Sequence, residues 1–200
     1  MRLITREQAQ ELDHLTMSKH DISGESLMRN AGQKIAEFVQ SQLIGIHNPN
    51  IGIVSGKGNN GGDGFAAGEF LNNLGFKITV YSLEEKNNIT GASKFFHDHC
   101  SRDKVSIIYD HNPPVTKPDF DLMIDALFGT GFTGTMRNNL FPWVEWINDC
   151  KWIVAADIPS GVNANSGYAD EYAVKAHHTL TMGYSKLGML IEPGKSNSGE

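Results

Sequence analysis

The 200 residues suit a single globular domain, and 40% hydrophobic with 20% charged residues is an ordinary composition for one. The net charge of -6 excludes a broad basic surface for nucleic acid. Cys100 and Cys150 are too few for a disulfide framework and have no metal-binding spacing. No apolar run reaches the roughly 18 residues of a membrane span, and the N-terminus lacks a signal-peptide core. We therefore expect a cytoplasmic protein that binds neither nucleic acid nor membranes.

Two helices are expected before the first strand. Thr5 is a suitable N-cap for a helix over residues 5–19, and a second helix follows Ser23-Gly24. The apolar stripe of the second helix consists of Leu27, Ala31, Ile35, Phe38 and Val39. The two helices either pack on a sheet face or meet a partner subunit, and the residues alone leave both possibilities open.

The central stretch of the chain is a glycine-rich loop between a strand and a helix. Residues 51–55 have the short, β-branched pattern of a buried parallel strand, and glycine then fills five of the nine positions 56–64. The following helix is predicted to have Asp63 as its N-cap and to end at Gly75. A helix N-terminus of this kind favours an anion, most often a phosphate group.

The glycine spacing alone is not specific. Gly56-x-Gly58-x-x-Gly61 matches the dinucleotide fingerprint, with Glu84 and Glu85 at about the right distance to hold a ribose. A P-loop is excluded, because Gly62-Asp63 stands where that motif needs Lys followed by Ser or Thr.

Each polar side chain in this loop has two possible roles. Asp63 is either a helix cap or a ligand residue, and Asn59 and Asn60 either form a turn or offer a carbonyl oxygen to a cation beside the phosphate.

The remainder of the chain alternates strands and helices. Further strands are predicted at 77–82, 105–109, 121–126, 152–156 and 179–183. Helical stripes lie between them at residues 92–99 and 140–147, with Pro142 in a first turn. This order predicts an α/β fold, namely a Rossmann-like doubly wound three-layer αβα sandwich with two extra N-terminal helices.

Two of these strands are followed by or end on an aspartate. Asp125 and Asp157 are therefore placed where an open α/β sheet binds its ligands, although each could instead cap a loop. Asp125 with Asn60 and Ser160 suits a hard monovalent or divalent cation, and Asp157 is left to act on the reacting part of the ligand. Lys186, in a glycine-flanked loop, either contacts the ligand or is a solvated surface lysine. His177 and His178 have no ligand partner at suitable spacing.

Three motifs resemble the signature blocks of the NAD(P)H-hydrate epimerases, the YjeF N-terminal domain family. They are Asn59-Asn60-Gly61-Gly62-Asp63-Gly64, Asp125-Ala126-Leu127-Phe128-Gly129-Thr130-Gly131 and Asp157-Ile158-Pro159-Ser160-Gly161. The resemblance extends to Leu27-Met28-Arg29-Asn30-Ala31-Gly32 and to residues 179–188, so it covers nearly the whole chain.

The resemblance implies a single epimerase domain over residues 1–200 that interconverts the R and S epimers of hydrated NADH or NADPH. It further implies a potassium ion at Asn60, Asp125 and Ser160, a homodimer, and coupling to a separate dehydratase, for which this chain has no room. The implied ligand positions are Asn59, Asn60, Gly61, Gly62, Asp63, Gly129, Thr130, Gly131, Phe132, Thr133, Gly134, Thr135 and Asp157. Relatives usually continue through one more glycine-led strand and a short apolar tail, and without them the last edge of the sheet is left open.

Two other functions remain open at this level. Members of the family also serve as binding modules or scaffolds without known turnover, so a non-catalytic nucleotide- or protein-binding role is the alternative. An NAD-dependent dehydrogenase is disfavoured, because the chain has neither a substrate domain nor an evident hydride-transfer residue.

Overall fold

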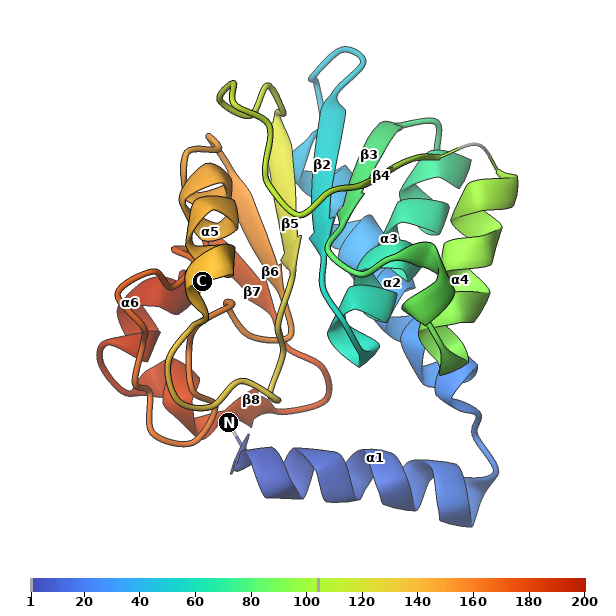
Figure 1. Ribbon diagram of the computed structural model, residues 1–200. Coiled ribbons are helices and arrows are strands. Elements are labelled where there is room, and N and C mark those ends of the chain that lie inside the picture. Colours follow the sequence, from blue (N-terminus) through green and yellow to red (C-terminus); the bar gives the residue numbers. More distant parts are fainter. Residues whose placement is uncertain (1, 104) are drawn as a thin grey trace.

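The computed structural model describes residues 2–103 and 105–200. Its main sheet has six parallel strands in the order β4-β3-β2-β5-β6-β7 (Figure 1). These strands are β2 (Asn50–Ser55), β3 (Lys77–Ser82), β4 (Ser106–Tyr109), β5 (Leu122–Ala126), β6 (Ile153–Ala156) and β7 (His178–Leu180). A separate two-stranded sheet pairs β1 (Leu3–Ile4) with β8 (Ser185–Lys186).

Helices cover both faces of the main sheet, which confirms the predicted three-layer αβα architecture. One face carries α2 (Gly24–Gln42), α3 (Asn59–Asn73) and α4 (Gly91–Arg102), and the other carries α5 (Phe141–Asn148) (Figure 1). The remaining helices are α1 (Arg6–His20) and α6 (Gly194–Ser198), with 3-10 turns at Lys86–Asn88, Asn138–Leu140 and Leu187–Leu190.

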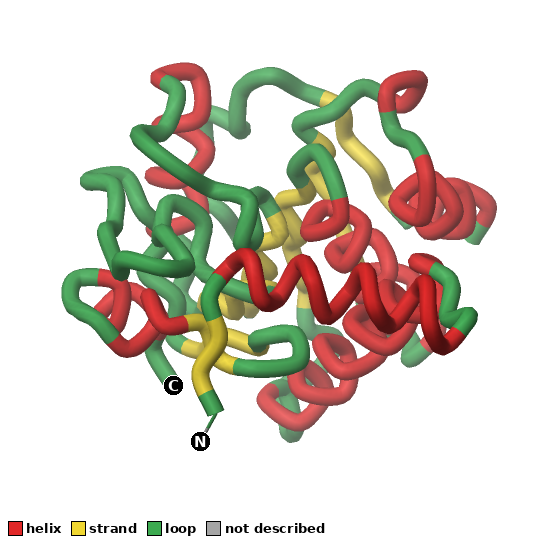
Figure 2. Tube along the Cα trace, turned by 90° about the horizontal axis from the view of Figure 1, so that it is seen from below, coloured by secondary structure: helices red, strands yellow, loops and turns green. Residues whose placement is uncertain are grey.

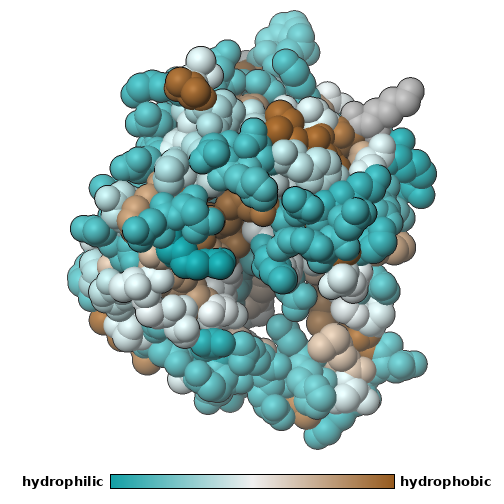
Figure 3. All heavy atoms as spheres, viewed as in Figure 1, coloured by the Kyte–Doolittle hydropathy of each residue, from teal (hydrophilic) through white to brown (hydrophobic). Residues whose placement is uncertain are grey.

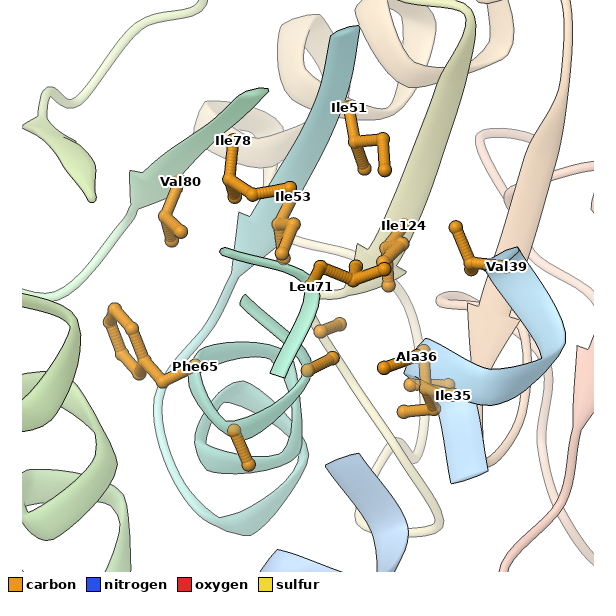
Figure 4. Close-up of a cluster of buried hydrophobic side chains, with 14 of the residues drawn as sticks. Ile35, Ala36, Val39, Ile51, Ile53, Phe65, Leu71, Ile78, Val80 and Ile124 are labelled. Atoms are coloured by element: carbon orange, nitrogen blue, oxygen red, sulfur yellow. The ribbon is translucent and has the colours of Figure 1, made fainter. Parts of the chain in front are cut away.

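The larger core lies between the sheet and the layer of α2 and α3. Its apolar side chains come from both helices and from β2, β3 and β5 (Figure 4). The labelled members are Ile35, Ala36, Val39, Ile51, Ile53, Phe65, Leu71, Ile78, Val80 and Ile124. Gly32 permits α2 to approach α3 closely, since a Cβ there would lie 2.6 Å from the backbone carbon of Ala66. This packing fixes the start of α3, which borders the site described below.

The two predicted N-terminal helices are present, and they differ in their packing. In α2, Ile35 and Val39 are buried as expected, whereas Leu27 and Ala31 line a cavity instead of the core. Thr5 caps α1 through a hydrogen bond from the Gln8 backbone N–H at 3.3 Å. No residue of α1 is buried, and the helix crosses the face seen from below (Figure 2).

Several predicted boundaries were wrong. The cap of α3 is Gly58 rather than Asp63, because the helix begins at Asn59 and includes both asparagines. Gly75 does follow the last turn, with a φ of 88°. The last strand of the main sheet ends at Leu180 rather than at residue 183, and Lys186 lies in β8, not in a loop.

Candidate functional site

A large cavity opens at the carboxyl ends of the central strands. β2 and β5 are neighbours in the sheet although the chain leaves them in opposite directions, so the loops after them diverge and form the crevice in which such sheets bind ligands. The cavity has a volume of about 1180 Å³, and residues of α1 form part of its wall. α1 runs below the carboxyl edge of the sheet (Figure 1), and the space-filling view shows a hollow above it (Figure 3). That volume is sufficient for a ligand of dinucleotide size.

The cavity wall combines six segments of the chain. Its lining residues are Ile4, Ala9, Gln10, Leu12, Asp13 and Thr16; Leu27, Asn30, Ala31 and Lys34; Lys57, Gly58, Asn59, Asn60 and Asp63; Phe128–Phe132, Thr133 and Thr135–Arg137 with Leu140; and Asp157 with residues 180–184 and Lys186.

The first turn of α3 faces this cavity with unsatisfied polar groups. Its cap residue Gly58 has a φ of 98°, which favours glycine, and no side chain caps the helix. The orphan N–H groups of the first turn therefore remain available to an anion. Asn60 is 9% exposed, and neither its Oδ1 nor its Nδ2 atom has a hydrogen-bond partner in the described part of the chain. A buried amide without a partner is costly, which points to a ligand.

Asp125 and Ser160 form a fully buried cluster that joins β5 to the segment after β6. The Ser160 hydroxyl donates to Asp125 Oδ1 at 2.6 Å, and the Ser160 backbone N–H donates to Oδ2 at 2.8 Å. The Leu127 N–H also donates to Oδ1, at 3.2 Å. Burial nevertheless raises the Asp125 pKa to about 6 against the lowering effect of these hydrogen bonds. The carboxylate therefore lacks a compensating positive charge.

Asp157 and Lys186 form a buried ion pair that borders the cavity. Asp157 follows β6 with a φ of 68°, a left-handed conformation that is strained for a residue other than glycine. Its Oδ1 accepts hydrogen bonds from the Lys186 ammonium group and from the Met182 N–H, and Oδ2 accepts one from the Thr130 N–H at 3.3 Å. Lys186 is 1% exposed and also donates to Thr181 Oγ1 at 2.8 Å. These contacts exclude the alternative of a solvated surface lysine.

Two further carboxylates share this environment. Burial raises the Asp63 pKa well above its ordinary value, and the charges of Asp157 and Asp13 raise it further. Asp13, on α1, has its own pKa raised by partial desolvation and then by Asp157, while Lys186 opposes both shifts. Three carboxylates of the cavity wall, those of Asp13, Asp63 and Asp157, thus share the electrostatic environment of Lys186.

The cation predicted from sequence is consistent with the donor atoms on this wall. Asp125 supplies one carboxylate, Ser160 a hydroxyl oxygen and Asn60 an unpartnered amide oxygen. A Cβ on Gly129 would lie 3.2 Å from Asn60 Oδ1 and 3.1 Å from Asp157 Oδ2, so the Asn60 amide lies against the loop that follows Asp125. No group of three or more His, Cys, Asp or Glu residues that could hold a metal occurs within residues 2–103 and 105–200. Neutral oxygens with one carboxylate fit a singly charged ion better than a divalent one.

The structure brings most of the predicted ligand residues to this cavity. Asn59, Asn60 and Asp63 line it, as do Asp157, Lys186 and the loop residues Gly129, Thr130, Gly131, Phe132, Thr133 and Thr135. Gly61 and Gly62 are buried in the first turn of α3. Gly134 does not line the cavity, and neither do Glu84 and Glu85, which the fingerprint placed near a ribose.

The sequence analysis missed the contribution of α1 and of three charged residues. Asp13, Lys34 and Arg137 all line the cavity. One face of α1 lines the cavity, and it consists of Ala9, Leu12, Asp13 and Thr16, which recur at helical spacing. A carboxylate on this otherwise uncharged face was the feature of the sequence that could have indicated Asp13.

Within the described residues, no helix is both long and apolar enough to cross a membrane.

The fold and the cavity define a Rossmann-like α/β protein whose ligand site lies at the switch point of the sheet. A family model described as YjeF-related protein N-terminus matches residues 24–188. The chain belongs to this family. A yeast protein, YNL200c, has a crystal structure that aligns with a TM-score of 0.83 over 93% of this chain and 82% of the yeast chain. At 22% identity, that likeness supports the fold.

Curated relatives fall into two groups by length. The bifunctional NAD(P)H-hydrate repair enzyme Nnr of Moorella thermoacetica is 31% identical over 100% of this chain, which spans 39% of that enzyme. The NAD(P)H-hydrate epimerase of Lentilactobacillus buchneri is 32% identical over 98% of this chain and 90% of its own length. The corresponding enzyme of Rhodopirellula baltica is 31% identical over 92% of this chain and 76% of its own length.

Proposed function

We propose that this chain is an NAD(P)H-hydrate epimerase, which interconverts the R and S epimers of hydrated NADH or NADPH. The observation that carries the proposal is the Asp157–Lys186 ion pair on the wall of a cavity that also contains the uncapped start of α3. The pair offers proton transfer, and the helix start offers a phosphate site. Relatives with the same activity in their names align over most of their own length, which supports the same assignment.

The proposed chemistry needs little more than a positioned proton. The substrate carries a hydroxyl group on a ring carbon next to the nicotinamide nitrogen. When the Asp157–Lys186 pair gives a proton to that hydroxyl, water leaves because the nitrogen lone pair stabilises the resulting cation. Water then adds to the opposite face of the ring and gives the other epimer. General acid–base catalysis of this kind typically accelerates a reaction by about 10²- to 10⁴-fold. The Lys186 ammonium contacts Asp157 and orients its carboxylate.

The remaining parts of the proposal follow the family expectation. Residues 1–200 form one epimerase domain, and a separate dehydratase consumes its S product. Asn60, Asp125 and Ser160 would hold a potassium ion, whose charge would offset the buried Asp125 carboxylate and neighbouring phosphates. We further propose that the protein is cytoplasmic and that it forms a homodimer. Light scattering of the purified protein tests the dimer.

A coupled assay tests the function. The protein is mixed with pure R epimer of NADHX, potassium and an S-specific dehydratase, and NADH formation is followed against the uncatalysed rate. We expect acceleration by the wild type and little by the Asp125→Ala variant. Bound nucleotide without acceleration would instead favour the alternative, a non-catalytic nucleotide- or protein-binding module.

A further inference from the structure

Inversion at a ring carbon requires proton transfer on both faces of the ring. The hydroxyl group leaves from one face of the ring, and the incoming water must lose a proton on the other. Asp157 can serve one face. Without a second acid–base group, water would return mainly to the face that it left, and the ring would keep its configuration.

The cavity lies between Asp157 and α1 in the sense that both line it. Asp157 directly follows β6, and α1 crosses below the carboxyl edge of the main sheet (Figures 1 and 2). The inward stripe of α1 contains Ala9, Leu12, Asp13 and Thr16, and Asp13 is its ionisable member. Within residues 2–103 and 105–200, no group forms a hydrogen bond or ion pair with the Asp13 carboxylate, so it is available to a ligand.

The start of α1 is fixed to the strand that carries Lys186. β1 pairs with β8 so that Ile4 lies opposite Lys186. The Arg6 N–H then donates to Asn165 Oδ1 at 2.7 Å, and Asn165 donates to Glu7 at 3.0 Å. Asp13 is therefore held at a defined place relative to the Asp157–Lys186 pair, although α1 itself has no buried residue.

We infer that Asp13 is a second catalytic residue of the proposed epimerase and serves the ring face opposite Asp157. In either direction, a proton passes from one side, Asp13 or the Asp157–Lys186 pair, to the leaving hydroxyl, and the carbon–oxygen bond breaks. Water then forms a new carbon–oxygen bond on the other face and gives its proton to the other group. Because Asp13 is exposed, its carboxylate exchanges the proton with solvent between turnovers. The inference rests on the proposed function, and Asp13 precedes the segment that the family model matches.

Oxygen exchange separates loss of water from inversion. Each pure epimer of NADHX is incubated in water enriched in ¹⁸O, and mass spectrometry with chromatography measures both label uptake and conversion to the other epimer. The variants are Asp13→Asn and, as a matched control, Glu11→Gln, which removes an acid from the same helix but does not line the cavity. Melting temperature and nucleotide affinity are measured for each.

For Asp13→Asn, we expect inversion to fall by about 100-fold or more while label uptake with retained configuration persists for the epimer that Asp157 serves. Glu11→Gln should match the wild type. Inversion by Asp13→Asn within about threefold of wild type would overturn the inference, as would equal loss of label uptake from both epimers. A wild type that accelerates neither process would instead overturn the proposed function, and the inference with it.

Discussion

The Asp157 carboxylate and the Lys186 ammonium group form a buried ion pair across 29 residues of sequence. Lys186 lies in β8 and Asp157 follows β6, so the pair ties the small sheet to the main one. The same pair borders the cavity. The contribution of this ion pair to protein stability and its role in the proposed reaction can therefore be tested separately.

Removal of Lys186 should destabilise the protein. Lys186→Met leaves the Asp157 carboxylate without its partner, and breaking a buried ion pair typically costs about 3 to 5 kcal/mol. Urea unfolding measures the loss. The double variant Asp157→Asn with Lys186→Met should lose less than the sum of the two single variants, since the cost comes from one unpaired charge. Additive losses would show that the two side chains do not act as a pair.

Ionisation of the buried Asp63 carboxyl should destabilise the folded protein as the pH rises. Its pKa in the folded protein lies well above the ordinary value of 3.8, mainly because of burial, so the unfolded state ionises first. The wild type therefore loses stability relative to Asp63→Asn as the pH rises above about 4. We expect the variant to melt higher at pH 8, by roughly 2 to 4 °C for each 1 kcal/mol gained, and to match the wild type near pH 4. A difference independent of pH would contradict this account of Asp63.

Potassium should stabilise the protein through the Asp125 cluster. An ion that binds the folded state alone adds about 1.4 kcal/mol at ten times its Kd. Melting temperatures are compared in potassium chloride and in choline chloride at equal ionic strength. We expect a saturable rise in potassium that Asn60→Ala abolishes and that Asn59→Ala, at the neighbouring exposed amide, retains. An equal response from both variants would remove Asn60 from the proposed ion site.

Much of the fold could be predicted because local patterns determine it. The β-branched run before Gly56 and the two aspartates at strand ends indicated parallel strands with a ligand edge, and the structure has them there. The start of α3 could not be predicted from capping preference. Aspartate is a common cap residue, but Gly58, with its positive φ, caps the helix five positions before Asp63.

Long-range contacts set the limit of the sequence analysis. Lys186 has the pattern of a surface residue, and its burial follows from the pairing of β8 with β1 at the opposite end of the chain. Asp13 joins the cavity only because α1 crosses the carboxyl edge of the sheet (Figure 2). Neither placement is encoded in the residues next to it.

The most direct test of the proposed epimerase is the approach to epimeric equilibrium without any coupling enzyme. Pure S epimer of NADHX is incubated with wild type or with Asp157→Asn, and chromatography follows the appearance of R epimer, while calorimetry measures ligand affinity. We predict fast equilibration by the wild type. For the variant, we predict a rate that is reduced by about 100-fold or more, at similar ligand affinity. Full activity of Asp157→Asn with normal binding would contradict the role assigned to Asp157.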